Sequence, residues 1–274
     1  MNYDLHSHTY YSDGKLSPKE LVMRATEHKV DFLALTDHDT VSGVAEAVAA
    51  ASNTNLKLIP GIEFSCTWNN RTIHMVGLNI DPHHPELLQA IEKLKIKRET
   101  RAKLITEKLT KYGIPGIEEG IAHQIKGVPG RLHYARYLVE RGYASTPGKA
   151  FKQYMAKGKP GYVPTEWLSI EESVNLIKAA GGVSVIAHPR RYDLTFKRLT
   201  NLTQEFTELG GDALEIATSS QGKDDQILLA GLARKFNLHA SVGSDFHEPC
   251  AYNELGKARF VVDIDEEKLI WALF

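Results

Sequence analysis

Short apolar runs, several rich in β-branched residues, alternate along this chain with segments of helical period. This alternation is typical of βα units and a parallel sheet, and it restricts the possible folds more than any other feature. Strands are expected at residues 3–5, 31–35, 56–62, 72–80, 182–187, 212–216, 238–243 and 259–262, with helices at 41–51, 170–180, 225–236 and 266–273. An α/β fold with an irregular βα barrel follows, although an open doubly wound sheet would give the same local signals.

The middle of the chain interrupts this rhythm. Residues 85–112 predict one long helix whose apolar stripe gives way to basic residues, and shorter helical pieces follow Gly113. No β pattern occurs between about residues 100 and 165, and the loop at 157–164 is rich in glycine and proline. We therefore expect a helical insertion at 98–164, acting as a substrate-binding cap on a barrel made from 1–97 and 165–274.

The composition, with 42% apolar and 24% charged residues in 274, is that of a globular protein. Two cysteines, Cys66 and Cys250, are too few for a secreted disulfide framework and are expected to be spectators in a reducing compartment. No stretch approaches the roughly 20 apolar residues of a membrane span, and the first residues do not resemble a secretory signal. A cytoplasmic protein with no membrane partner is expected.

The net charge of -1 conceals a strong asymmetry. Residues 93–160 contain 16 Lys or Arg against 5 Asp or Glu, whereas the rest of the chain contains 17 basic and 29 acidic residues. This division indicates an acidic body and a basic segment that faces an anionic partner, although a solvated basic helix would look the same. The segment is too compact to predict sequence-specific binding of duplex nucleic acid.

Histidines and acids follow the expected strands at or just beyond their carboxyl ends. In a βα barrel the loops that hold the active site converge at that end. Because side chains alternate along a strand, His6 and His8 share one side, as do Asp245 and His247. The nine candidate metal ligands are His6, His8, Asp13, His38, Glu63, His74, His188, Asp245 and His247.

Nine such ligands exceed what one ion needs, since a catalytic zinc takes about three from protein. With bridging carboxylates the set suits two or three divalent ions, and imidazole and carboxylate donors without cysteine favour Mn, Fe or Zn. Asp37 and Asp39 flank His38 and stay outside the set, because they are expected to orient His38 or to cap the following helix.

The ordered motifs of this sequence resemble the polymerase and histidinol phosphatase (PHP) family of metal-dependent phosphoesterases. The motifs are HSHTYYSDG, TDHD, GIEFS, His74, AHP and SDFH, and the resemblance spans Asp4 to about His247. The position of the insertion and its RLHYAR segment are most similar to a bacterial branch that hydrolyses nucleoside 3′,5′-bisphosphates, some members of which shorten RNA from its 5′ end. The resemblance implies a distorted (β/α)7 TIM-like barrel and three metal ions, with Mn²⁺ favoured.

The resemblance also implies how the ligands are shared among the ions. One ion would be held by His6, His8, Glu63 and Asp245, a second by Glu63, His74 and His188, and a third by Asp13, His38 and His247.

The implied activity is removal of the 3′-phosphate from nucleoside 3′,5′-bisphosphates, and cleavage of short 5′-phosphorylated RNA, through a metal-bridging hydroxide. Arginine binds phosphate through two parallel hydrogen bonds. The expected substrate contacts are therefore Arg98, Arg101, Arg131, His133 and Arg191, and Tyr134, Tyr162 or Trp167 are candidates to stack on a base.

Three other readings stay open. Within the same reaction class the chain could be a histidinol-phosphate phosphatase. A metal-dependent amidohydrolase or deaminase would share the barrel and the paired histidines but would not need the basic insertion. A non-catalytic module that keeps its metals for structure is disfavoured by the complete set of ligands.

Overall fold

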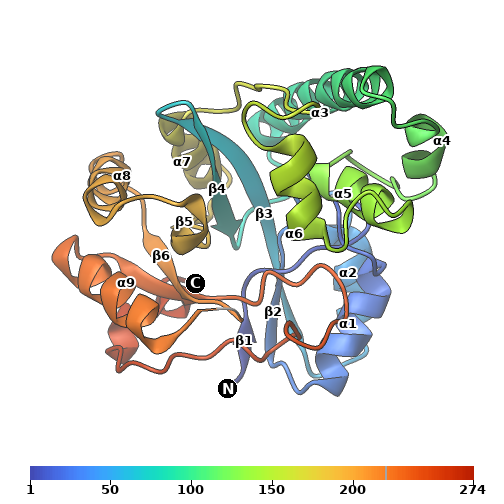
Figure 1. The fold of residues 1–274 in the computed structure, drawn as a ribbon. Coiled ribbons are helices and arrows are strands. Elements are labelled where there is room, and N and C mark those ends of the chain that lie inside the picture. Colours follow the sequence, from blue (N-terminus) through green and yellow to red (C-terminus); the bar gives the residue numbers. More distant parts are fainter. Residues whose placement is uncertain (220) are drawn as a thin grey trace.

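A computed structural model describes residues 1–219 and 221–274, and within them the strands form a nearly closed sheet of seven in chain order (Figure 1). The fold is therefore the expected distorted α/β barrel. Its strands are β1 (Tyr3–Asp4), β2 (Phe32–Leu35), β3 (Lys57–Trp68), β4 (Arg71–Leu78), β5 (Val183–Ile186), β6 (Ala213–Ala217) and β7 (His239–Val242).

The first and last strands meet without a regular ladder. The amide of Leu5 donates to the carbonyl of Val242 at 3.0 Å, and beyond the strands the amide of His8 donates to Phe246 at 2.9 Å. In the other direction, the amide of Asp245 donates to the carbonyl of His6 at 2.9 Å. This seam joins the segments that follow β1 and β7 beside the candidate metal ligands.

One part of the sheet differs from the expected parallel pattern. β4 runs antiparallel to both β3 and β5, because the turn between β3 and β4 is a tight hairpin. Its two central residues, Asn69 and Asn70, have φ of 46° and 60°, a left-handed geometry that asparagine tolerates in hairpin turns. As a result His74, near the start of β4, pairs with Ser65 and lies at the same end of the barrel as the carboxyl ends of the parallel strands.

The barrel helices are α1 (Pro18–Glu27), α2 (Val44–Ala51), α7 (Ile170–Ala179), α8 (Phe196–Glu208) and α9 (Lys223–Lys235). α1 and α8 were not among the predicted helices, and α2 starts three residues later than predicted, at an N-cap glycine. Ser17 and Ser169 close capping boxes at the starts of α1 and α7, which satisfies backbone donors that the helices leave unpaired.

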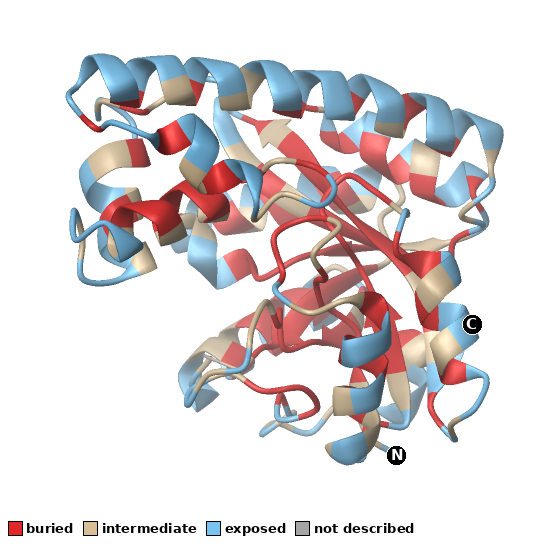
Figure 2. Cartoon of the chain, turned by 90° about the vertical axis from the view of Figure 1, so that its right-hand side faces the viewer, coloured by how far each residue is buried: buried red, intermediate tan, exposed pale blue. Residues whose placement is uncertain are grey.

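The predicted long helix is α3 (Pro85–Lys111), and residues 100–165 contain no strand, as expected. Figure 2 shows α3 along one side of the molecule with its outer face exposed. It is followed by α4 (Ile117–Ala122), α5 (Arg131–Glu140), α6 (Pro147–Ala150) and a π-helical turn, η1 (Phe151–Met155). These helices share an apolar cluster of their own that includes Ile105, Leu109, Tyr137 and Met155.

The predictions of a strand at 259–262 and a helix at 266–273 are wrong. Residues 259–262 form no strand, because the Gln226 side chain pairs with this backbone in place of a neighbouring strand. It accepts from the Val261 amide at 2.9 Å and donates to the Arg259 carbonyl at 3.0 Å. The expected terminal helix is two 3₁₀ turns, η3 (Glu266–Lys268) and η4 (Ile270–Leu273). In the described parts of the chain, no helix combines the length and apolar character that crossing a membrane requires.

The two faces of each strand have different roles. On β6, Leu214 and Ile216 belong to the large apolar cluster that also includes helix residues of α7, α8 and α9, whereas Ala213 belongs to a smaller cluster with residues of β2 to β5. Alternation along the strand puts Glu215 on the same face as Ala213. On β3 the same alternation puts Glu63 on the face opposite Ile62 and Phe64. The inward faces therefore carry apolar side chains at one end of the barrel and polar groups at the other.

Candidate metal centre

The nine predicted ligands gather at one end of the barrel, although the first and last are 241 positions apart in the chain. His6 and His8 follow β1, Asp13 lies in the next loop, and His38 follows β2. The β3–β4 hairpin supplies the next two side chains, and the loops after β5 and β7 supply the last three: Glu63, His74, His188, Asp245 and His247.

Glu63 lies at the centre of the cluster and is fully buried. One oxygen, Oε2, is 2.7 Å from His38 Nδ1 and 3.4 Å from His8 Nε2. The other, Oε1, is surrounded by three further imidazole nitrogens, at 2.9 Å for His74, 3.1 Å for His188 and 3.3 Å for His6. A carboxylate in this position can bridge two ions, as the predicted arrangement requires.

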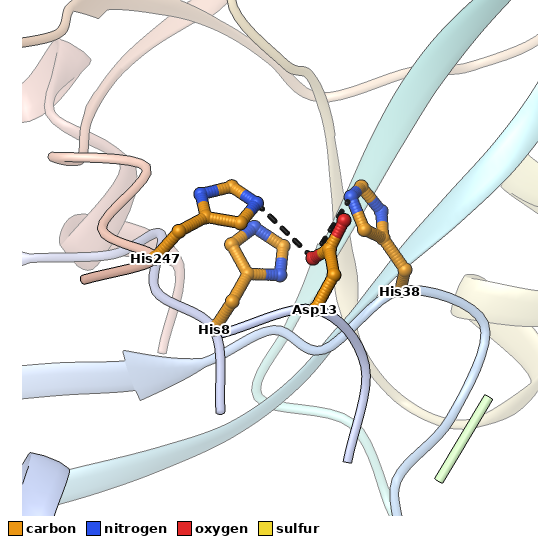
Figure 3. A group of neighbouring side chains, drawn as sticks. All are labelled: His8, Asp13, His38 and His247. Atoms are coloured by element: carbon orange, nitrogen blue, oxygen red, sulfur yellow. Dashed lines mark ion pairs between the residues drawn. The ribbon is translucent and has the colours of Figure 1, made fainter. Parts of the chain in front are cut away.

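The other two acids lie nearer the seam. Asp13 Oδ1 is 3.1 Å from His247 Nε2 and 3.8 Å from His38 Nε2, and Figure 3 shows both imidazoles directed at this carboxylate. Asp245 Oδ1 is 3.1 Å from His8 Nε2 and 3.4 Å from His6 Nε2. Its other oxygen forms an ion pair with Arg191.

Three groups of donor atoms each lie within 4.8 Å of one another. The group of His6, His8, Glu63 and Asp245 is the set expected for the first ion. The other two differ from expectation, because His8 joins the group of Asp13, His38 and His247, and His38 takes the place of His188 beside Glu63 and His74. His188 belongs to none of the three groups, although its Nε2 is 3.1 Å from Glu63 Oε1.

The donor atoms fit divalent metal ions. Four buried atoms, His6 Nε2, Asp13 Oδ1, His38 Nδ1 and Glu63 Oε2, lie in the close pairs described above but form no hydrogen bond of good geometry among the described residues. Buried polar atoms are rarely left unpaired, because removing them from water without a partner costs free energy. Coordination to ions would satisfy all four atoms.

Electrostatics in the cluster favour ionised acids. Burial alone would raise the pKa of Glu63, but His38 and His74 outweigh it and hold that pKa well below the usual value. His247 and His38 act in the same way on Asp13. In return, the Asp13 carboxylate overcomes the effect of burial on His247 and raises its pKa to about 9. Acids that stay ionised supply the charge that metal ligation needs.

Asp37 and Asp39 do not have the roles expected of them. Asp37 accepts from the Thr9 amide at 2.7 Å and from Ser12 Oγ at 2.6 Å, so it fixes the loop that carries His8. Asp39 accepts from the Ser65 amide at 2.7 Å and contacts an arginine of α3. Neither caps α2, whose N-cap is Gly43.

A pocket of about 290 Å³ opens from the cluster toward the insertion. Of the five predicted substrate contacts, the four arginines line it. Gly130, Leu132 and Phe151 complete its insertion side. The same pocket is lined by six of the nine predicted ligands: Asp13, His38, His74, His188, Asp245 and His247.

His133 is the fifth predicted contact, and it does not line this pocket. Its Nδ1 accepts from the Gly130 amide at 3.0 Å, so the ring caps the start of α5. The aromatic residues proposed for stacking are also elsewhere: Tyr134 is buried with its hydroxyl donating to Ala102 O at 2.6 Å, and neither Tyr162 nor Trp167 lines the pocket.

Several residues of the site were not predicted, and two of them bear on its chemistry. Phe151 is the aromatic residue of the pocket, and the α-helix changes to a π-helix at its position. Glu215 is a buried carboxylate that contacts His6. An acidic residue inside the apolar strand pattern of residues 212–216 was the available signal, because an unpaired charge is costly in a barrel interior.

Comparisons with known proteins agree with this geometry. The PHP domain model matches residues 4–219. The 5′-3′ exoribonuclease of Haemophilus influenzae is 47% identical, over 95% of this chain and 95% of that protein. The 3′,5′-nucleoside bisphosphate phosphatase of Chromobacterium violaceum is 40% identical, over 90% and 88%. A solved structure from the latter organism, described as an amidohydrolase with bound SO4 and no metal, superposes with a TM-score of 0.93 at 38% identity, covering 99% of this chain and 95% of that one.

Proposed function

Since the chain belongs to the PHP domain family and is a phosphoric ester hydrolase, we propose that it removes the 3′-phosphate of nucleoside 3′,5′-bisphosphates. Short 5′-phosphorylated RNA is the second substrate of the same pocket. The nine clustered side chains would hold the ions, with three ions and Mn²⁺ favoured. This proposal explains both the acidic barrel end and the basic insertion.

The arrangement of the arginines carries the proposal. Arg101 and Arg131 line the pocket, and neither forms an ion pair with an acid among the described residues. Burial, together with the neighbouring guanidinium groups, lowers the pKa of both. Arginine stays protonated in proteins, so the concentration of positive charge favours an anion in the pocket. A second phosphate, distant from the one held by the ions, would provide that anion.

Bound ions would activate a water molecule and neutralise charge on the phosphate undergoing hydrolysis. The protein orients the ester between this cluster and the arginines. Arg191 extends from η2 (Pro189–Tyr192) to pair with Asp245, and it lies where a guanidinium can also contact a phosphate oxygen.

Leu132 and Phe151 form the apolar part of the pocket and would contact the base or the sugar. The guanidinium of Arg131 lies 5.5 Å from the centre of the Phe151 ring, a cation–π distance that orients both side chains. Stacking on an aromatic ring accepts any base, so this end of the pocket suits different nucleosides.

Phosphate release with added Mn²⁺ tests the proposal. The substrates are a nucleoside 3′,5′-bisphosphate, the matching 3′- and 5′-monophosphates, a 5′-phosphorylated RNA of a few nucleotides and histidinol phosphate. We expect the highest kcat/KM for the bisphosphate, with measurable shortening of the RNA. A higher kcat/KM for histidinol phosphate than for the bisphosphate would identify the enzyme as a histidinol-phosphate phosphatase instead.

An amidohydrolase activity is the second candidate, because a closely superposing structure is described by that name. Ammonia release from nucleobases and nucleosides, measured with the same metal-loaded protein, separates the two reaction classes. Ammonia release without phosphate release would favour the amidohydrolase. We place the enzyme in the cytoplasm, because Cys66 and Cys250 are both free thiols.

A further inference from the structure

β6 is the one strand that contributes none of the nine predicted ligands, yet it carries a buried carboxylate next to them. Glu215 is 2% exposed and stands on the inward face of the barrel. A buried carboxylate is costly unless its oxygens accept hydrogen bonds, so its partners indicate its role.

The two oxygens of Glu215 contact two different ligand candidates. Oε1 lies 2.9 Å from Nδ1 of His6, and Oε2 accepts from the backbone amide of His188 at 2.6 Å. An ionised carboxylate can only accept, so Nδ1 of His6 carries the proton in this contact. The other nitrogen, Nε2, is then available as a ligand, and it faces Glu63 and Asp245 at 3.3 and 3.4 Å.

The contact with His188 acts on the backbone. His188 has φ of 29°, a left-handed conformation that residues other than glycine rarely adopt, and it precedes Pro189. A strained conformation of this kind persists only when surrounding contacts impose it. The amide held by Glu215 is one such contact, and it helps fix the direction from which the His188 ring reaches Glu63.

Packing leaves the pair of Glu215 and His6 little freedom. A Cβ atom at Gly243 would lie 2.3 Å from Cβ of His6 and 2.9 Å from Oε1 of Glu215. Only glycine can occupy that position beside the two side chains. The hydrogen bond between Glu215 and His6 therefore depends on the glycine that follows β7 as well as on β6.

We propose that Glu215 is a positioning residue that fixes the proton of His6 on Nδ1, aims Nε2 at the metal centre and holds the backbone of His188. This proposal rests on the metal-dependent function above but does not depend on which ester is the substrate. Removing a carboxylate that orients a metal-ligating histidine weakens metal binding by about 10- to 100-fold.

Glu215→Gln is the direct test. Glutamine has nearly the same shape, but one of its terminal groups donates, so it cannot accept from both His6 and His188. Calorimetric titration of metal-free protein with Mn²⁺ alone should show at least one class of site weakened by about 10- to 100-fold. With saturating Mn²⁺, kcat should fall while KM for the bisphosphate stays within about twofold, since the arginines are unchanged.

The matched control is Glu254→Gln. Glu254 is also buried, and it accepts from Arg24 Nε at 2.9 Å, but it lies outside the pocket. This variant should lower thermal stability without changing Mn²⁺ affinity. Unchanged Mn²⁺ affinity in Glu215→Gln, or equal weakening in both variants, would overturn the proposal.

A measurement on the unmodified protein covers the case in which Glu215→Gln does not fold. Nitrogen-15 NMR of histidine-labelled protein loaded with diamagnetic Zn²⁺ reports which ring nitrogen of His6 carries the proton. We expect the proton on Nδ1, and a proton on Nε2 would refute the proposal. Neither this readout nor Mn²⁺ affinity uses a substrate, so a wrong substrate assignment would leave their outcomes intact.

Discussion

Asp39 Oδ2 lies 2.7 Å from Nε of Arg98, and both side chains are buried beside the pocket. Nη2 of the same guanidinium donates to Ser65 Oγ at 3.0 Å. The charge of Arg98 is therefore neutralised by a fixed carboxylate, and the arginine connects α3 to the loop after β2 and to β3. The three arginines on the insertion side thus differ: Arg98 is chiefly structural, whereas Arg101 and Arg131 keep their charge for an anion.

This difference predicts distinct kinetic effects. Arg101→Ala and Arg131→Ala should each raise KM for a nucleoside 3′,5′-bisphosphate about 10- to 100-fold, the equivalent of one charge-assisted hydrogen bond of about 1.5–3 kcal/mol. KM for a monophosphate should change much less, because it lacks the second anionic group. Steady-state kinetics on both esters measures the ratio.

Lys103→Ala is the control for general charge, because Lys103 is exposed on the same helix. It should leave both KM values within about twofold, as surface charges contribute little at physiological salt. If Arg101→Ala and Arg131→Ala raised both KM values equally, the second-phosphate assignment would be wrong.

Removing the metal should abolish turnover and lower stability. Ions that bind only the folded chain stabilise it by about 2.7 kcal/mol at a concentration 100 times their Kd. Dialysis against a chelator should therefore lower Tm and stop phosphate release, and added Mn²⁺ should restore both. Differential scanning fluorimetry and a phosphate assay follow the two effects.

His8→Ala should remove nearly all activity, because its Nε2 lies near both Glu63 and Asp245. The matched variant is His83→Ala, whose side chain is exposed and belongs to neither the ligand groups nor the pocket lining. It should keep full activity. Retention of substantial activity in metal-saturated His8→Ala would contradict the assignment of this residue as a ligand.

The contact between the insertion and the loop after β1 predicts an effect of Gly127→Ala. The amide of Val128 donates to Tyr11 O at 2.9 Å, and a Cβ at Gly127 would lie 2.0 Å from that oxygen. The added methyl group must push the segment before α5 away from Asp13, so the pocket loses its correct width. We expect a several-fold higher KM and a lower Tm.

Gly148→Ala is the control for replacing a glycine of the insertion at a position without close contacts, and it should not reproduce the higher KM and lower Tm of Gly127→Ala. A Cβ there has no neighbour within 4 Å, and the residue lies in α6. Alanine should be neutral or raise stability by up to about 1 kcal/mol, because it favours the helix more than glycine does. Equal KM changes in the two variants would show that the Gly127 contact does not position the insertion.

Cys66 gives a prediction for stability at high pH. Burial raises the pKa of its thiol, which lies 2.9 Å from Ser173 Oγ. In the unfolded chain the thiol ionises near its ordinary pKa of about 8.5. Above that pH unfolding releases a proton, so stability falls as pH rises, by up to about 1.4 kcal/mol per pH unit from this group.

Urea unfolding between pH 8 and 10 measures this slope, and Cys66→Ala should make it shallower by the stated amount. An unchanged slope would show that the thiol is not the group responsible. Alkylation at pH 8 gives a second check. Cys250 is half-buried and should react, whereas buried Cys66 should stay unmodified until the protein unfolds.

Much of the fold could be predicted because the strands and long helices have strong local patterns. The short apolar runs of the strands and the apolar stripe of α3 are properties of neighbouring residues. The hairpin at Asn69 and Asn70 was not predicted, since its reversal depends on backbone angles that most sequences avoid. The prediction of a strand at 259–262 was wrong because of a tertiary contact. The Gln226 side chain of α9 forms the backbone hydrogen bonds that a neighbouring strand would otherwise form.

The grouping of the nine candidate ligands was predictable for a different reason. Ligand-type residues at the ends of successive strands converge in any barrel, so their grouping follows from topology. The contacts of Asp39 and His133 could not be predicted, because each depends on how the helices of the insertion approach the barrel. The role of Glu215 required knowing which face of β6 points inward.

The seam between β1 and β7 has a mechanical consequence. His6 and His8 lie on one side of it and Asp245 and His247 on the other, so shared ions would crosslink the two terminal regions of the polypeptide. Amide hydrogen exchange at Leu5, His8 and Asp245 should therefore slow sharply on ion loading, while the distant insertion core around Ile105 and Tyr137 keeps its rate. Metal binding would then close the barrel between β1 and β7 and complete the catalytic site in the same step.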